Sequence, residues 1–112
     1  MTALDGWIDR FLTFATAERG FSPHTVAAYA RDLACLAAFA EDRGTLADAR
    51  LDAKLLLEFL AAERRRGLGS RSQARRAAAL RGFGRFLVLA GAVASSPATD
   101  LHVRAGLPRL PH

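Results

Sequence analysis

Cysteine, proline and long apolar runs are scarce in this sequence, and each scarcity excludes a class of protein. The single cysteine, Cys35, excludes an intrachain disulfide and a cysteine-based metal cage. No apolar run approaches the length of a membrane span, and the N-terminus MTALDGWIDRF lacks the basic start and apolar segment of a secretory signal. With four prolines in 112 residues and an abundance of Ala, Leu and Arg, the composition favours helices over strands. We therefore expect a soluble, cytoplasmic, all-α protein.

The residue patterns that carry catalysis are also missing. The sequence has no glycine-rich phosphate loop, no His-x-x-x-His pair and no paired carboxylates at an obvious cleft. Cys35 lies in the middle of a predicted helix with no base beside it. Tyr29 falls on the apolar face of the same helix and is interpreted as a core residue. The sequence thus predicts no catalytic residue, no cofactor and no metal site, so that this chain by itself is not an enzyme.

Acidic residues are absent from residues 64–85, a segment that carries eight arginines. The rest of the chain holds eight Lys and Arg against eleven Asp and Glu, so the net charge of +5 is a local +8 on a background of −3. A solvated helix usually mixes both signs. A block of one sign at this density indicates a polyanionic partner, although a solvated basic face built from a good helix former remains the alternative.

Helical periodicity arranges this block. On a helix that starts after Ser70 and advances about 100° per residue, four arginines share one stripe about 120° wide. We call these four residues the arginine stripe: Arg71, Arg75, Arg81 and Arg85. The positions between them are Ala74, Ala78 and Gly82, while Leu80, Phe83 and Leu87 point to the opposite, core-facing side. The small residues within the stripe would let a phosphate chain approach closely.

Four helices are predicted, over about residues 4–19, 23–43, 53–66 and 70–89, with a short turn capped by Ser96 after them. Glycines at positions 20, 44 and 91 stop three of these helices, Gly67 and Gly69 flank the break after the third, and Asp52 is the predicted N-cap of the third. In the first helix, Trp7 and Phe11 are the predicted core anchors. The final residues contain Gly106, Pro108 and Pro111 and are expected to form an extended linker.

The start of the second helix offers a second polar surface. Ser22 is a good N-cap and Pro23 suits the first helical position. The Ser22 hydroxyl and the free N–H groups of this turn could bind a phosphate, whereas plain N-capping needs no ligand. His24, Ala27, Ala28 and Arg31 lie on the face away from the core. His24 has no partner for a metal site and is interpreted as a surface residue.

At these residues the chain resembles a known family. Residues 22–33, SPHTVAAYARDL, resemble the S-x-x-T-x-x-x-Y-x-x-D-L opening of the second helix in the core-binding domain of Xer-type tyrosine recombinases and phage integrases. Residues 72–87 are similar to that family's S-x-x-R-x-L-S-A-L-R-x-F-x-x-F-L helix, and residues 96–111 to its N-P-A … P-K-L-P-x-x-L-P passage. Each motif is weak alone, but the series covers nearly all of the chain in the right order.

The resemblance implies a compact, SAM-like bundle of four main helices plus a short C-terminal helix, spanning residues 1–103. Residues 104–112 would lead to a catalytic domain that is absent from this sequence. In that family the bundle is one arm of a clamp on DNA, with the second and fourth helices facing the major groove. The catalytic arginine, lysine, His-x-x-Arg pair and tyrosine lie in the other domain, so none of them can be assigned here.

The predicted partner is therefore a double-stranded recombination half-site. The arginines would lie mainly on phosphates, and one or two of them near the helix start, with His24 or Arg31, would reach base edges. The chain alone is expected to be a monomer, its parent recombinase a tetramer on DNA. Two alternatives remain: a helical protein–protein interaction module, and a helix-turn-helix regulator, which the 67–69 link disfavours. This chain has Ala77 and Ala78 where the family pattern has Leu and Ser. Gly82 and Gly84 predict that the fourth helix is less rigid by itself and becomes rigid on docking to DNA. The predicted DNA-binding residues are Ser22, His24, Thr25, Ala28, Arg31, Arg71, Ser72, Arg75, Arg81 and Arg85.

Overall fold

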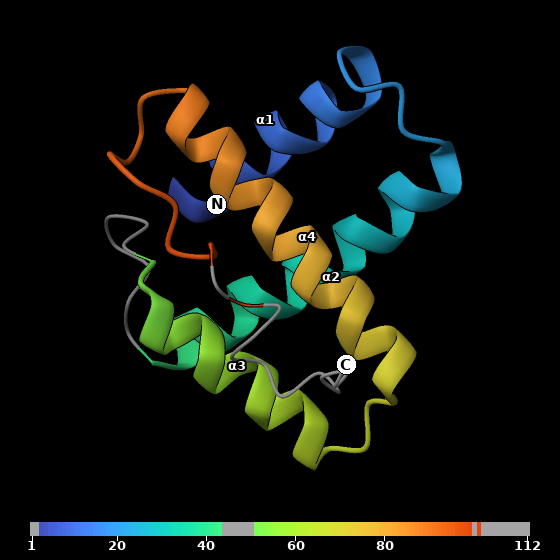
Figure 1. The fold of residues 1–112 in the computed structure, drawn as a ribbon, viewed down its shortest axis with the longest axis vertical. Helices are drawn as coiled ribbons and strands as arrows, with labels where there is room; N and C mark the ends of the chain where they lie inside the picture. The colour runs from blue at the N-terminus through green and yellow to red at the C-terminus, as the bar shows by residue number, and fades with distance from the viewer. Residues whose placement is uncertain (1–2, 44–50, 100, 102–112) are drawn as a thin grey trace, which may run out of the picture. The chain divides into compact units, whose positions relative to one another are not determined.

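Four α-helices make up the part of the fold that the structure describes, and the sequence predicts all four. The computed structural model describes residues 3–43, 51–99 and 101, and its helices are α1 (Ala3–Ala17), α2 (Pro23–Asp42), α3 (Ala53–Arg65) and α4 (Ser70–Leu89) (Figure 1). The all-α class is confirmed. Gly44, the predicted stop of the second helix, and residues 104–112 lie outside the described residues, as does most of the predicted short C-terminal helix, so these stay predictions.

The helix ends follow from local signals in the sequence. Gly20, Gly67 and Gly91 have φ values of 65°, 102° and 80°, a region that glycine adopts without the steric cost of a Cβ. Ser22 and Asp52 are the N-caps of α2 and α3, as predicted, with their side chains accepting from the N–H groups of Thr25 and Leu55. α1 ends two residues before the predicted boundary, because the chain already turns toward Gly20 there.

The chain divides into two compact units, residues 1–50 and 51–112. In the first unit, α1 packs on α2. Phe11 is buried, which confirms it as a core anchor, and its ring stacks on that of Tyr29 at 6.5 Å while Phe21 meets Tyr29 edge-on at 5.7 Å. Trp7 is only half-buried and carries the Arg10 guanidinium 4.7 Å from its ring centroid, so it is a rim residue rather than the predicted core anchor.

In the second unit, α3 packs on α4. The apolar stripe predicted for the fourth helix is buried, and α3 buries an apolar face of its own: Leu55, Leu56, Phe59 and Leu60 on α3, and Leu80, Phe83 and Leu87 on α4. The segment after α4 folds back along the same helix (Figure 1), where Ser96 and Ala98 lie against Gly84. The Ser96 hydroxyl accepts from the N–H of Ala98 at 3.0 Å. Ser96 therefore caps the backbone at the start of the turn that the sequence predicts here.

Gly84 therefore has a packing role in the native fold. It is buried, and a Cβ on it would overlap the Ser96 hydroxyl and lie 3.3 Å from the Ala98 Cβ. The sequence alone favoured a different reason, a helix loosened for docking on DNA. The structure instead shows a glycine that lets the 96–98 segment close over α4.

Loss of the α3 N-cap is the first testable consequence of this fold. Asp52→Ala removes the 2.8 Å hydrogen bond from the Leu55 N–H to the Asp52 carboxylate, and we expect the free energy of unfolding to fall by about 1 kcal/mol. Urea unfolding followed by circular dichroism measures this change. Lys54→Ala, an exposed change in the same first turn, is the control and should shift stability by less than about 0.5 kcal/mol.

Candidate nucleic-acid interface

The arginine stripe is the candidate interface that the sequence predicts most sharply. Arg71 and Arg85 are exposed, as predicted, and Arg75 is half-buried. Of the small residues between the arginines, Ala74 is exposed while Ala78 and Gly82 are half-buried. Ser72 is half-buried beside the stripe. The exposed positive charge of α4 is thus concentrated at the two ends of the stripe, fourteen residues or about 21 Å apart at 1.5 Å per residue.

Arg81 differs from the other members of the stripe. The residue is half-buried, and its Nη1 is buried without a hydrogen-bond partner. Burial of an unpaired guanidinium nitrogen has a free-energy cost, since the nitrogen loses its hydrogen bonds to water. The four arginines of the stripe are therefore not equivalent. Arg71 and Arg85 are exposed to solvent, whereas Arg81 is partly buried.

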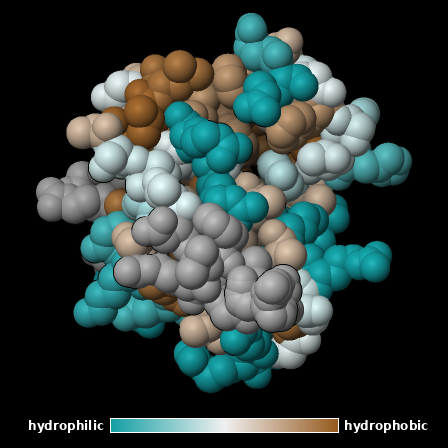
Figure 2. Space-filling model, viewed as in Figure 1, coloured by the Kyte–Doolittle hydropathy of each residue, from teal (hydrophilic) through white to brown (hydrophobic). Residues whose placement is uncertain are grey.

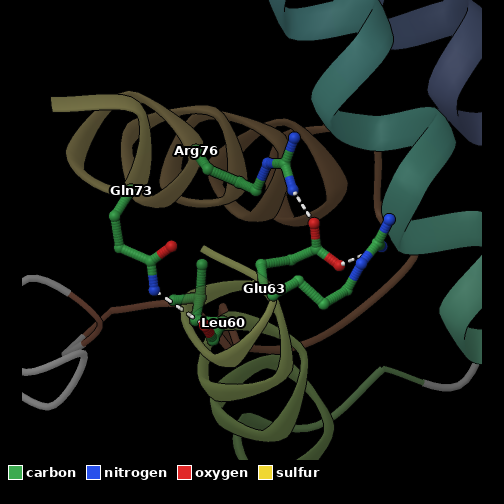
Figure 3. Close-up of polar contacts among 5 residues, drawn as sticks. Leu60, Glu63, Gln73 and Arg76 are labelled. Atoms are coloured by element: carbon green, nitrogen blue, oxygen red, sulfur yellow. Dashed lines mark hydrogen bonds and ion pairs between the residues drawn. The ribbon is translucent and has the colours of Figure 1, made fainter. Parts of the chain in front are cut away.

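Arg76 is held inside the second unit by a buried ion pair. Its Nη1 donates to Glu63 Oε1 at 2.6 Å, and the side chains of Arg76 and Glu63 are only 7% and 11% exposed (Figure 3). The other carboxylate oxygen of Glu63 accepts from Arg66 Nη1 at 3.1 Å. The helical wheel also directs Arg76 toward the apolar side of α4, where a snorkelling or capping side chain would be expected. That expectation is wrong, because the guanidinium itself is buried and paired.

Gln73 extends this buried polar cluster toward the start of α4. Its side chain donates from Nε2 to the carbonyl oxygen of Leu60 at 2.7 Å, a carbonyl on α3 (Figure 3). Gln73 is 2% exposed, and its Oε1 has no hydrogen-bond partner. Together with the Glu63–Arg76 pair, this bond ties α4 to α3, so the N-terminal half of α4 is fixed at the angle at which it presents Arg71.

The predicted face of α2 is exposed in the first unit. His24, Ala27 and Arg31 are exposed and Ala28 is half-buried. The Ser22 hydroxyl is committed to local bonds: it accepts from the N–H of Thr25 at 3.2 Å and donates to the Thr25 hydroxyl at 3.1 Å. This favours the plain capping alternative for Ser22. That this face and the arginine stripe form one DNA-facing surface remains a prediction, because the two belong to different units.

Several functional features of the second unit were missed from the sequence. Arg64, Arg65 and Arg66 are all exposed at the end of α3, although none of them is among the predicted DNA-binding residues. Glu63 was not singled out, although it continues the buried positions Leu56, Phe59 and Leu60 at three- and four-residue spacing. A charged residue in register with an apolar stripe is the signal that identifies a buried ion pair.

The described residues offer little for other site chemistries. Among them, no group of three or more His, Cys, Asp or Glu side chains lies where it would hold a metal ion. None of the helices in residues 3–43 and 51–99 combines the length and the apolar character needed to cross a membrane. Val88 and Leu89, at the C-terminal end of α4, are the exposed large apolar residues of this part of the chain, and apolar atoms (brown) gather at the upper left of Figure 2, where that end of α4 lies in Figure 1.

Comparison with known proteins places the chain beside recombinases. Residues 8–91 match the family described as phage integrase, N-terminal SAM-like domain. Over 93% of its length the chain is 41% identical to "Tyrosine recombinase XerC" of Xylella fastidiosa (strain 9a5c) and 37% identical to the protein of the same name in Xanthomonas axonopodis pv. citri (strain 306). It is 35% identical over 96% of its length to the same-named protein of Pseudomonas syringae pv. syringae (strain B728a).

These likenesses cover only part of each relative. The chain spans 35% to 37% of the length of the three recombinases. No solved structure matches the chain significantly. The family match over residues 8–91 covers most of α1, all of α2, α3 and α4, and the arginine stripe. The comparisons therefore bear on this helical part and not on the activity of a whole recombinase.

Proposed function

Since the chain belongs to the phage integrase N-terminal SAM-like domain family, we propose that it binds double-stranded DNA. As the core-binding domain of a tyrosine recombinase of the XerC kind, it would grip a half-site of a recombination sequence. Strand cutting and rejoining would be carried out by residues outside this chain. A monomer in isolation, assembling as a tetramer on DNA within the whole recombinase, is part of the same proposal.

The observation that carries this proposal is the exposed, acid-free basic face of α4. No Asp or Glu occurs in residues 64–99, and Arg71 and Arg85 present their charge to solvent at the two ends of the arginine stripe. A guanidinium pairs well with phosphate because its donors form a rigid fork. The exposed Ala74 between them leaves room for a backbone to approach.

The roles of individual residues follow from their exposure. Arg71, Arg75 and Arg85 are proposed to contact phosphates, which position the protein without reading sequence. Arg81 would contribute less in the bound geometry, since one of its two terminal nitrogens is buried. His24 and Arg31, exposed on α2 beside Thr25 and Ala28, are the proposed candidates for base edges.

Removal of the two exposed stripe arginines tests the proposal. For Arg71→Ala combined with Arg85→Ala, we expect affinity for a duplex carrying a recombination half-site to fall about a hundredfold, from roughly 1.5 kcal/mol per lost charge-assisted contact. The slope of log K against log[salt] should also become shallower by about 1.8. Fluorescence anisotropy titrations at several salt concentrations measure both quantities.

The control variant has the same net charge as this double variant, but the two arginines are removed outside the arginine stripe. Arg10→Ala combined with Arg19→Ala removes two exposed arginines of the first unit, and affinity should change less than threefold. Binding of the wild-type chain that does not depend on salt would contradict the proposal. Equal binding to the duplex and to an unrelated polyanion such as heparin would instead favour the alternative of an acidic protein partner.

A further inference from the structure

The arginines at the end of α3 form a second basic surface that the arginine stripe does not include. Arg64, Arg65 and Arg66 are exposed, the side chain of Arg66 by 75%. We call these three arginines and the Gly67–Gly69 link the basic corner. Hydrophilic side chains (teal) gather at the bottom of Figure 2, where α3 ends in Figure 1. The acid adjacent in sequence, Glu63, is 8% exposed and shares its single negative charge between Arg66 and Arg76, so the three arginines keep a net positive charge.

Capping of the α3 C-terminus does not need three arginines. The carbonyl groups at the end of α3 are already satisfied by backbone N–H groups: Gly67 donates to Arg64 at 3.0 Å and Leu68 donates to Glu63 at 3.1 Å. This pair of bonds, with Gly67 in the left-handed region, completes a Schellman motif. The arginine side chains are therefore not needed as caps, and favourable interaction with the helix dipole would be met by one cation.

The link to α4 also leaves open backbone at the same place. Gly69 is the N-cap of α4, and no side chain caps the helix there. Gly69 has φ −71°, which any residue adopts, and a Cβ on it would meet no atom within 4 Å. Neither its conformation nor its packing requires glycine. A glycine without a structural reason, at a positive helix end beside three exposed arginines, fits a site where a phosphate comes close to the backbone.

We propose that the basic corner is a second phosphate-binding surface, which holds the sugar-phosphate backbone of the same duplex beyond the arginine stripe. This inference rests on the proposed DNA binding and extends the footprint of α4 past its N-terminus. The occupant is backbone phosphate rather than a base, because arginines on an exposed helix end and open N–H groups supply charge and donors without the fixed geometry that reads a base edge.

Two variants test the basic corner. Arg64→Ala combined with Arg65→Ala leaves the Arg66–Glu63 pair in place and should lower duplex affinity about tenfold, equally for matched and unrelated sequences, with a salt slope shallower by about 1.8. Gly69→Asp supplies a side-chain N-cap and a carboxylate at a positive helix end, so the melting temperature should rise. The same carboxylate repels phosphate, so duplex affinity should fall about tenfold.

Gly69→Asp should thus raise stability while it lowers duplex affinity, and these opposite changes distinguish a ligand-binding role of this corner from a structural one. Ala92→Asp places the same charge beyond the other end of α4, about 30 Å away along a helix of 20 residues and well past the screening length at physiological salt. It should leave duplex affinity within twofold. If Gly69→Asp and the arginine pair both bind DNA as the wild type does, while Arg71→Ala with Arg85→Ala does not, the basic corner is not a phosphate site and the proposed function stands. A wild-type chain that binds no duplex overturns both.

Discussion

Glu63→Ala is expected to lower the free energy of unfolding by about 3–5 kcal/mol, because it removes one charge of a buried ion pair and leaves the buried arginine behind. The change removes the carboxylate whose Oε1 lies 2.6 Å from Arg76 Nη1, and Arg76 stays behind with a side chain only 7% exposed. A buried cation that loses a paired carboxylate keeps its desolvation cost but not the attraction that offset it. Urea or thermal unfolding, followed by circular dichroism, measures the loss.

Arg66→Ala is the matched control, because Arg66 pairs with the same carboxylate from the solvent side. The Arg66 side chain is 75% exposed and lies 3.1 Å from Glu63 Oε2. An exposed pair of this kind contributes about 0–1 kcal/mol. Arg76→Ala should fall between the two, at about 2–3 kcal/mol, since Glu63 would keep Arg66 as a partner while the Phe59 ring would lose the guanidinium 5.5 Å from its centroid. Equal losses for Glu63→Ala and Arg66→Ala would contradict the role assigned to burial.

A further variant separates stability from specificity at this pair. Glu63→Leu combined with Arg76→Met replaces two buried charges with apolar side chains of similar size, which is often neutral or stabilising. We expect it to recover most of the loss of Glu63→Ala. If the ion pair is what sets the angle between α3 and α4, the same variant should still bind DNA more weakly than the wild type, because Arg71 lies five residues before Arg76 on the same helix.

Local signals explain how much of this fold the sequence predicts. Ser22, Asp52 and Gly20 each act through their own backbone neighbours, so the helix boundaries they mark can be predicted without knowing any distant contact. The core faces of α3 and α4 follow equally well, because apolar spacing along one helix decides which side is buried. The exposure of Arg71 and Arg85 is the other half of the same pattern.

Contacts between helices could not be predicted in the same way. Glu63 and Arg76 stand thirteen residues apart on two helices, and only the packing of α3 on α4 brings them within hydrogen-bond distance. Arg81 lies in the stripe by its wheel position, yet the fold buries its Nη1. A helical wheel gives the direction of a side chain from its own helix axis and carries no information on which other segments cover that side. It therefore predicts an exposed guanidinium for Arg81, which is partly buried, and does not predict the buried ion pair of Arg76.

Gly84→Ala is the second expected large effect, a loss of about 1–3 kcal/mol in the free energy of unfolding. An alanine in an open helix site would stabilise α4 by up to about 1 kcal/mol relative to glycine. At this site the added Cβ overlaps the Ser96 hydroxyl and lies 3.3 Å and 3.4 Å from the Ala98 and Ser96 Cβ atoms. Overpacking of this kind outweighs the helix preference, and moving the hydroxyl aside breaks its 3.0 Å bond from the Ala98 N–H.

Gly6→Ala provides the matched control for the helix preference itself. Gly6 lies within α1, and a Cβ there would meet no atom within 4 Å, so the substitution should stabilise the chain by about 0.5–1 kcal/mol. The two glycine substitutions should thus have opposite signs in the same unfolding experiment. In a Ser96→Gly background the cost of Gly84→Ala should shrink by at least about 1 kcal/mol, because the overlapping side chain is gone. An unchanged cost in that background would mean that Gly84 is required for some reason other than the return of residues 96–98 over α4.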